Sequence, residues 1–277
     1  MTSRPEGLYV SGGRLGSTFL DSFELYDPST DSWSAMPPLL APRAGHGSAL
    51  GPDGSIYVVG GFDGRSDLDR LELFDPVSGT WSAGKSMPTP RRALAEVIAD
   101  NRLYAIGGFD GGRTLDTVEV YDLVDRSWST GSPLPTPRRG LAAAVGPDRQ
   151  IYVAGGAGDT GVLETLEAFD LDTGTWSLRA PLTAARQGLA LVAGDNNLLY
   201  AIGGSAGSTF LSIVEAYDAT IDQWQFVAPM LTERSGIAGD LGPDGRIYGA
   251  GGNNESGFQS VVEAYCPRPS EDGLDGD

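Results

Sequence analysis

Residues 55–64 read Ser-Ile-Tyr-Val-Val-Gly-Gly-Phe-Asp-Gly, residues 71–76 read Leu-Glu-Leu-Phe-Asp-Pro, and Trp81 follows them. The apolar run before the glycine pair is typical of a strand that is buried on both faces. Residues 69–74 alternate polar and apolar side chains, which indicates a half-buried strand, and a short outer strand carries Trp81. With residues 45–50 ahead of them, these segments predict a unit of four short strands.

This unit recurs six times along the 277 residues. The glycine pairs begin at Gly12, Gly60, Gly107, Gly155, Gly203 and Gly251, at intervals of 47 or 48 residues. An aromatic residue follows the first glycine of each pair by 14 positions, and a glutamate precedes that aromatic by two. A tryptophan follows the aromatic by seven positions at Trp33, Trp81, Trp128, Trp176 and Trp224. Four-stranded units at this period are typical of propeller blades, because radial repetition hides most sheet edges.

These phrases, together with Met-Pro-Thr-Pro-Arg at residues 87–91, resemble the Kelch family over nearly the whole chain. The resemblance implies an all-β fold, a six-bladed β-propeller of four-stranded antiparallel blades. We assign residues 1–267 to the propeller and expect residues 268–277 to form an acidic, disordered tail. A two-sheet sandwich is the alternative fold, but it does not explain the fixed period.

The two ends of the chain predict incomplete closure between blades 1 and 6. The N-terminus enters just before the apolar residues 8–11, so we expect the first strand of blade 1 to be absent. The residues after Tyr265 contain no tryptophan and have little β propensity, so a poor outer strand is expected in blade 6. Two explanations stay open: the chain is part of a longer protein, or another segment pairs into the gap.

The composition narrows the classes of partner. A net charge of −18 and a sequence pI of about 4.3 argue against binding to nucleic-acid phosphates. No apolar stretch reaches 18 residues, so no membrane span is predicted. The single Cys266 allows no internal disulfide, and the first residues lack a signal-peptide pattern, so we expect a cytoplasmic location. Only one of the 19 basic residues is a lysine, a bias that suggests a bacterial source.

One face of the predicted ring carries aspartates in the loops between strands one and two and between strands three and four of each blade. They are Asp27, Asp31, Asp53, Asp75, Asp100, Asp122, Asp125, Asp148, Asp170, Asp172, Asp195, Asp218, Asp222 and Asp244. Aspartate suits turns because its side chain accepts hydrogen bonds from the backbone just after it. A weak cation site is the alternative, although no calcium-loop pattern occurs.

The opposite face carries an arginine column at Arg43, Arg91, Arg138, Arg186 and Arg234. A residue that recurs in every blade suits a structural role, such as pairing with the repeated glutamates. The resemblance to Kelch propellers implies instead that this face binds partners, and arginines there would hold carboxylates in bidentate geometry. Both interpretations stay open, and the second predicts a protein or peptide partner of acidic or polar character.

Residues that differ between blades are the better functional candidates. After the glycine pairs come Arg14, Phe62, Phe109, Ala157, Ser205 and Asn253. Beside the repeated arginines lie Arg92 and Arg139 in the loops that enter blades 3 and 4. Aromatic side chains next to arginines are typical interface anchors, so we predict the contact patch around blades 2 and 3. The alternative is that each phenylalanine packs under its own Asp-Gly turn.

Catalysis is not predicted. His46 is the only histidine and Cys266 the only cysteine, so neither a nucleophile–base triad nor a zinc site is indicated. We expect no cofactor and no metal. The leading hypothesis is a non-catalytic interaction module. The alternatives are a mutarotase for sialic-acid-type sugars, in which the arginines would hold the carboxylate, and a purely structural repeat domain of a larger bacterial protein.

Overall fold

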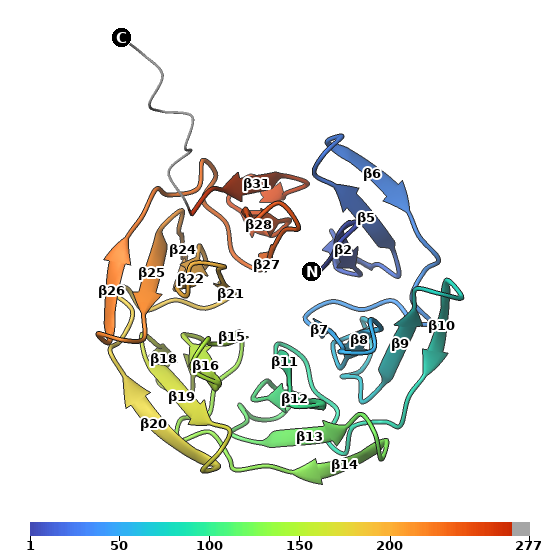
Figure 1. Cartoon of the computed structure of the whole chain (residues 1–277), viewed down its shortest axis with the longest axis horizontal. Coiled ribbons are helices and arrows are strands. Elements are labelled where there is room, and N and C mark those ends of the chain that lie inside the picture. Colours follow the sequence, from blue (N-terminus) through green and yellow to red (C-terminus); the bar gives the residue numbers. More distant parts are fainter. Residues whose placement is uncertain (268–277) are drawn as a thin grey trace.

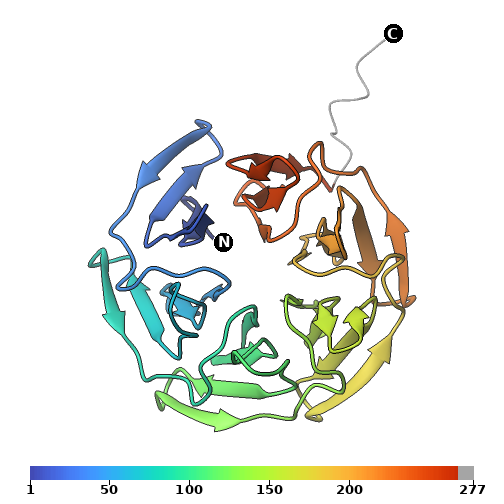
Figure 2. The ribbon, with the colours of Figure 1, turned by 180° about the vertical axis from the view of Figure 1, so that it is seen from behind.

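A computed structural model describes residues 1–267 and shows an all-β ring of six blades (Figure 1). The blades follow one another around the ring in chain order, and the N-terminus lies near its centre (Figures 1 and 2). The predicted six-bladed propeller is therefore confirmed. Among the described residues, no helix is long and apolar enough to cross a membrane.

Each blade is an antiparallel meander whose first strand lies nearest the ring axis. Blade 1 contains β1 (Thr2–Arg4), β2 (Gly7–Ser11), β5 (Phe23–Asp27) and β6 (Ser32–Ala35). Blade 2 contains β7 (Gly47–Leu50), β8 (Ile56–Val59), β9 (Leu71–Asp75) and β10 (Thr80–Ala83). Blade 3 contains β11 (Ala95–Ala99), β12 (Arg102–Ile106), β13 (Val118–Asp122) and β14 (Ser127–Thr130).

The second half of the ring repeats this order. Blade 4 contains β15 (Ala142–Val145), β16 (Gln150–Ala154), β19 (Leu166–Asp170) and β20 (Thr175–Arg179). Blade 5 contains β21 (Ala190–Ala193), β22 (Leu199–Ile202), β25 (Val214–Asp218) and β26 (Gln223–Phe226). Blade 6 contains β27 (Ala238–Leu241), β28 (Ile247–Ala250) and β31 (Val262–Tyr265).

Short hairpins lie between the second and third strands of four blades. They pair β3 (Arg14–Leu15) with β4 (Thr18–Phe19), β17 (Ala157–Gly158) with β18 (Gly161–Val162), β23 (Ser205–Ala206) with β24 (Thr209–Phe210), and β29 (Asn253–Asn254) with β30 (Gly257–Phe258).

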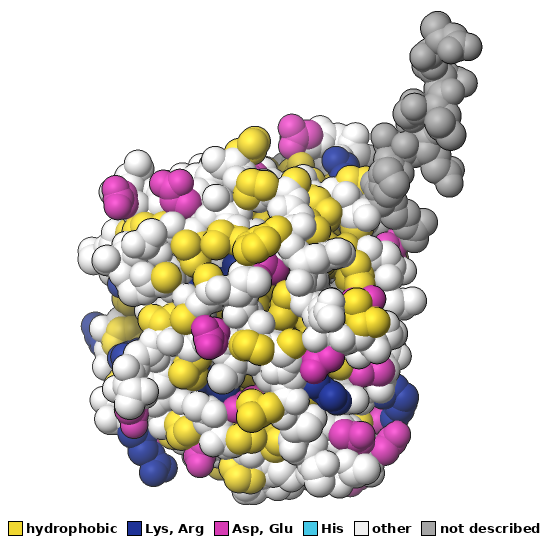
Figure 3. Space-filling view, turned by 90° about the vertical axis from the view of Figure 1, so that its left-hand side faces the viewer, with side chains coloured by type: hydrophobic (Ala, Val, Ile, Leu, Met, Phe, Trp, Pro, Cys, Tyr) yellow, Lys and Arg dark blue, Asp and Glu magenta, His cyan; other side chains and the backbone are white. Residues whose placement is uncertain are grey.

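The core lies between neighbouring blades. Ile151 and Val153 of β16 are buried in one cluster with Val97 and Ile106 of blade 3. The second strands are apolar on both faces because both faces meet another blade, as their unbroken apolar runs predict. The outer strands are more exposed, and large hydrophobic side chains lie among polar ones on the rim of blades 4 to 6 (Figure 3).

The tryptophans connect neighbouring blades. Four indole nitrogens donate hydrogen bonds to carbonyl oxygens of the loop that follows the preceding blade: Trp81 to Pro37, Trp128 to Lys85, Trp176 to Ser132 and Trp224 to Ala180, at 2.7–3.0 Å. These hydrogen bonds place the four rings between neighbouring blades. Trp33 differs, since its side chain is 44% exposed.

The glycine pairs end the second strands in a conformation that other residues rarely adopt. Gly155 has a φ of +60°, and a Cβ added there would lie 2.4 Å from the carbonyl oxygen of Arg186. The loop that enters the next blade therefore crosses directly over the glycine. This close approach explains why the glycine column recurs in every blade.

The expectation that blade 1 lacks its first strand is wrong. Residues Thr2–Arg4 form β1, which pairs with β2 through Thr2–Tyr9, Ser3–Leu8 and Arg4–Gly7. The segment is polar, so hydropathy does not mark it, and its ladder with β2 uses backbone groups that any residue provides. The incomplete blade is blade 6, whose sheet has three strands among the described residues. The predicted tail, residues 268–277, lies outside those residues.

Blades 1 and 6 meet by packing, and within residues 1–267 neither sheet takes a strand from the other end of the chain. The Ser3 amide donates to the Asp240 carboxylate at 2.7 Å. The rings of Tyr26 and Tyr248 lie 6.0 Å apart between the two blades. As far as the described residues show, closure between blades 1 and 6 is therefore incomplete, as predicted, and the strand that is lacking among them is the outer strand of blade 6 and not a strand at the axis.

Candidate partner-binding surface

The loops between the second and third strands lie on the same face as the loops that enter each blade. Isolated bridges connect them, pairing Ala44 with Phe62 and Arg92 with Phe109. The residue after each glycine pair is thus held beside the residue after the repeated arginine. The structure brings together the two variable columns that the sequence analysis singled out.

The five repeated arginines are buried. Arg43, Arg91, Arg138, Arg186 and Arg234 are each 0% exposed. Each forms an ion pair with a glutamate of the blade that it enters: Glu72, Glu119, Glu167, Glu215 and Glu263 respectively. Each also donates to the carbonyl oxygen of the first glycine of that blade's pair. A guanidinium enclosed in this way cannot reach a partner, so these five residues belong to the framework of the blades.

Arg138 shows the arrangement in detail. Its Nη2 lies 2.8 Å from Oε1 of Glu167, and both side chains are 0% exposed. Its Nη1 donates to the carbonyl oxygens of Gly155 at 3.0 Å and Thr165 at 3.2 Å. Burial lowers the pKa of the Arg138 guanidinium, while the charge of Glu167 acts in the opposite direction. The pairing with glutamates that the structural interpretation predicted is confirmed.

Four residues of blades 2 to 4 form an alternating column, here called the Phe62–Arg139 stack: Phe62, Arg92, Phe109 and Arg139. The Arg92 guanidinium lies 4.6 Å from the Phe62 ring centre and 5.1 Å from that of Phe109. The Arg139 guanidinium lies 4.8 Å from the Phe109 ring centre. Such cation–π contacts hold the long arginine side chains in place.

Two residues that the sequence analysis did not single out extend this stack. Phe19 meets Phe62 edge to face at 5.4 Å, and Asp67 pairs with Arg92 at 2.9 Å. Phe19 and Asp67 occupy the same place in successive repeats, 48 positions apart, opposite the residue after the glycine pair. The positions five residues after the variable residue of each glycine pair form a column of their own. This column was the sequence signal that could have identified Phe19 and Asp67.

The other predicted site residues lie apart from the stack. Arg14 covers the ring of Phe258 at 5.2 Å, across the boundary between blades 1 and 6. Asn253 bridges to Ser235 in blade 6, while Ala157 and Ser205 hold the equivalent places in blades 4 and 5. The predicted site residues therefore form three groups. The five repeated arginines belong to the buried framework, four residues form the Phe62–Arg139 stack, and Arg14 and Asn253 lie apart from both near the boundary between blades 1 and 6.

The aspartates of the opposite face form local turns. Asp75, Asp122, Asp170 and Asp218 each accept hydrogen bonds from backbone amides two or three residues later. Hydrogen bonds lower the pKa of each carboxyl: for Asp218 the bond from the Thr220 hydroxyl acts most and the backbone bond next, and for the other three the backbone bonds act most. The turn-forming interpretation of this column is confirmed for these four residues.

No group of three or more histidine, cysteine or acidic side chains is placed to hold a metal ion within residues 1–267. His46 lies 3.0 Å from the Ser11 hydroxyl through Nε2, and burial lowers its pKa to about 3, with the charge of Arg43 acting in the same direction. The mutarotase alternative relied on the repeated arginines to hold a sugar carboxylate. Their burial leaves that alternative without a supporting observation.

Comparison with protein families matches residues 1–182 to the KLHDC2/KLHL20/DRC7 Kelch-repeats domain and residues 189–231 to the Kelch motif. No curated protein matches the chain. The first match spans blades 1 to 4, and the second covers most of blade 5.

Proposed function

Since the chain belongs to the Kelch-repeat family, whose propellers are typically protein-interaction modules, we propose that it binds a protein or peptide through the Phe62–Arg139 stack. The observation that carries this proposal is the alternation of two aromatic rings with two guanidinium groups on one face of the ring. Aromatic residues, phenylalanine among them, and arginine are enriched at protein interfaces relative to the rest of the surface.

The stack is already ordered before a partner arrives. Arg92 is fixed by Asp67 and by two phenylalanine rings, so little side-chain entropy remains to be lost on binding. Arg139 is exposed and forms no ion pair with any residue between 1 and 267. Its guanidinium is therefore the group that would pair with a carboxylate of the partner, while the phenylalanine rings cover apolar groups beside it.

The test compares the partners captured from cell extract by the native chain and by an Arg139→Ala variant. Arg149→Ala is the matched control, because Arg149 is an exposed arginine in a loop of the opposite face. We expect a partner that the native chain and the control retain and the Arg139→Ala variant loses. Phe109→Ala should weaken the same partner. Identical partners in all variants would contradict the proposal.

A further inference from the structure

The boundary between blades 3 and 4 contains a hollow of about 490 Å³ on the face that carries the aspartate turns. One wall is a single face of the blade 3 sheet, where the paired positions Arg102 and Asp122 lie next to the paired positions Tyr104 and Val120. The other wall is the ring of Phe169 from β19 of blade 4, which lies 6.2 Å from the ring of Tyr104. The volume falls within the range of about 300–1,000 Å³ that is typical of small-molecule sites.

The loop between the first two strands of blade 3 leaves one side of this hollow open. In the other blades a side chain of that loop forms a hydrogen bond with the tyrosine three residues before the glycine pair: Glu6 with Tyr9, Asp53 with Tyr57, Asp148 with Tyr152, Asn196 with Tyr200 and Asp244 with Tyr248. The interval that ends at the glycine pair of blade 3 is the one of 47 residues, and its loop is the two-residue turn Asp100–Asn101. Asp100 pairs instead with Arg149 of blade 4 at 2.8 Å, so the loop side chain that covers the tyrosine elsewhere is drawn away from Tyr104.

Blade 4 leaves the other side of the hollow open. At the next boundary, between blades 4 and 5, the Tyr217 hydroxyl donates to the Asp222 carboxylate at 2.6 Å beside the ring of Tyr152. Phe169 and Gly174 stand 48 positions before Tyr217 and Asp222, so they supply neither the hydroxyl nor the carboxylate. A Cβ added at Gly174 would meet no atom within 4 Å. Among the described residues, blade 4 therefore lines this hollow with a phenylalanine ring and with no polar side chain.

The polar side chains that blade 3 places in the hollow retain the capacity to bind a ligand. The Asp125 carboxylate and the Ser127 hydroxyl have no hydrogen-bond or ion-pair partner within residues 1–267. Asp122 uses Oδ1 to accept from the amides of Val124 and Asp125, while its Oδ2 lies 3.9 Å from Nε of Arg102, too far for a hydrogen bond. The Arg102 side chain is 56% exposed. One cation and two anions thus line the hollow without satisfying one another.

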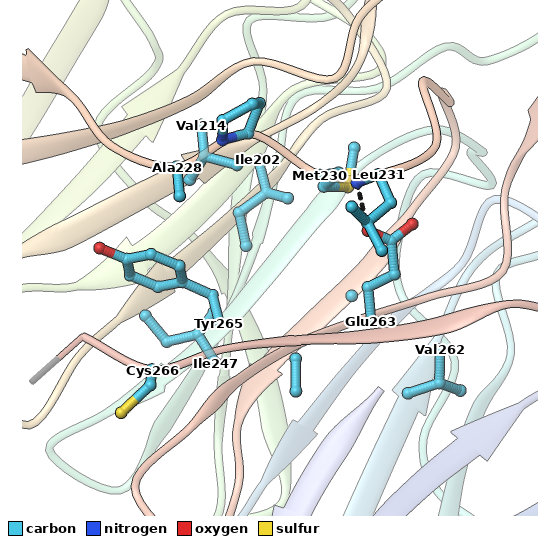
Figure 4. Close-up of a pocket in the computed structure, with 13 residues that line it drawn as sticks. Ile202, Val214, Ala228, Met230, Leu231, Ile247, Val262, Glu263, Tyr265 and Cys266 are labelled. Carbon is cyan, nitrogen blue, oxygen red and sulfur yellow. Dashed lines mark hydrogen bonds between the residues drawn. The ribbon is translucent and has the colours of Figure 1, made fainter. Parts of the chain in front are cut away.

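A second hollow, of about 480 Å³ beside β31, shows the contrast (Figure 4). Its lining is mainly apolar and includes Ile202 and Ile247. The carboxylate of Glu263, which also lines it, accepts a hydrogen bond from the Leu231 amide at 2.6 Å and pairs with one of the repeated arginines. That carboxylate is committed within blade 6, whereas the charged groups between blades 3 and 4 are not.

We propose that the hollow between blades 3 and 4 binds a small zwitterion, an α-amino acid with an apolar side chain. The carboxylate of the ligand pairs with the Arg102 guanidinium, which can hold it in bidentate geometry. The ammonium group of the ligand donates to the carboxylates of Asp122 and Asp125. The apolar side chain of the ligand packs against Phe169 and Val120. A simple anion or a simple cation would leave part of this set of charges unpaired, whereas a zwitterion pairs with both signs.

The test is an NMR titration of the full chain with L-leucine at pH 7. We expect saturable binding with a Kd of about 1 mM or tighter. Two analogues keep the apolar part of leucine and remove one charge each: 4-methylpentanoate lacks the ammonium group, and 3-methylbutylamine lacks the carboxylate. Each should bind about tenfold more weakly or worse, because it loses the hydrogen bonds to one charged partner. If either analogue binds as tightly as leucine, the ligand class is wrong.

Substitutions in the chain locate the ligand. Arg102→Gln and Asp125→Asn should each weaken leucine binding about tenfold or more. Asp172→Asn is the matched control and should leave binding unchanged, because Asp172 is an exposed aspartate in the corresponding turn of blade 4 and does not line the hollow. Arg139→Ala should also leave it unchanged, which separates this hollow from the Phe62–Arg139 stack. Absence of saturable leucine binding, or unchanged binding by either lining variant, would overturn the proposal.

Discussion

The buried pair of Arg138 and Glu167 offers the most direct test of how the blades are held together. Removing one member of a buried ion pair costs about 3–5 kcal/mol, because the other charge stays enclosed without its partner. In the Arg138→Ala variant Glu167 keeps only the hydrogen bond from the Thr136 hydroxyl at 2.7 Å, and the carbonyls of Gly155 and Thr165 lose their donor. We therefore expect Arg138→Ala to lower the free energy of unfolding by about 3–5 kcal/mol.

For a chain of this size each kcal/mol lowers the melting temperature by about 2–4 °C, so Arg138→Ala should lower it by roughly 6–20 °C. Urea unfolding followed by tryptophan fluorescence measures the free energy directly. Arg139→Ala is the matched control, because it removes a neighbouring but exposed arginine and should change the free energy of unfolding by about 0.5 kcal/mol or less.

A double substitution separates the interaction between Arg138 and Glu167 from the other contacts of these two residues. The double variant Arg138→Met/Glu167→Gln leaves no buried charge. It should therefore lose less free energy of unfolding than the sum of the losses measured for Arg138→Met and Glu167→Gln alone. If Arg138→Ala melts within about 2 °C of the native chain, the buried pair does not support the blade and this reasoning fails.

Two further substitutions test other parts of the framework. Gly155→Ala should destabilise the chain by about 1 kcal/mol or more, since it combines a φ of +60° with a Cβ placed 2.4 Å from the Arg186 carbonyl oxygen; unchanged urea unfolding would contradict this. Burial raises the pKa of Glu96 well above its usual value, against the opposing charges of the N-terminus and Arg43, and neither of its carboxyl oxygens has a hydrogen-bond partner among the described residues. The folded state therefore holds the proton of the Glu96 carboxyl more tightly than the unfolded state does. The stability that this proton contributes is fully present below about pH 4.5, the usual glutamate value, and is lost as the pH rises above it. Glu96→Gln should stabilise the chain at neutral pH and show a shrinking advantage as the pH falls to 4; an advantage that does not depend on pH would refute this assignment.

Much of the fold could be predicted from the repeat. The apolar runs, the glycine pairs and the tryptophans recur because every blade must bury two faces, turn tightly and close its boundary with the blade before it. The first strand, Thr2–Arg4, escaped prediction because its pairing with β2 uses backbone groups that any residue provides. Hydropathy carries no information about such a strand.

The candidate site was only partly predictable. The sequence placed Phe62, Phe109, Arg92 and Arg139 in adjacent loops, but their alternation in one stack depends on how blades 2, 3 and 4 are rotated against one another. Asp67, which fixes Arg92, lies 25 residues away from it in the chain and reaches it only through that rotation.

The sequence by itself determined the number of blades and the identity of the family, because six copies of one four-stranded unit, with the same glycine, aromatic and tryptophan columns at intervals of 47 or 48 residues, are typical of propeller blades. Only the tertiary structure decided that the arginine column is buried and paired with the glutamate column. The physical reason is that a repeated arginine looks the same in sequence whether its guanidinium faces water or a carboxylate. Its role depends on a glutamate about 29 residues away, which only the folded blade brings to it.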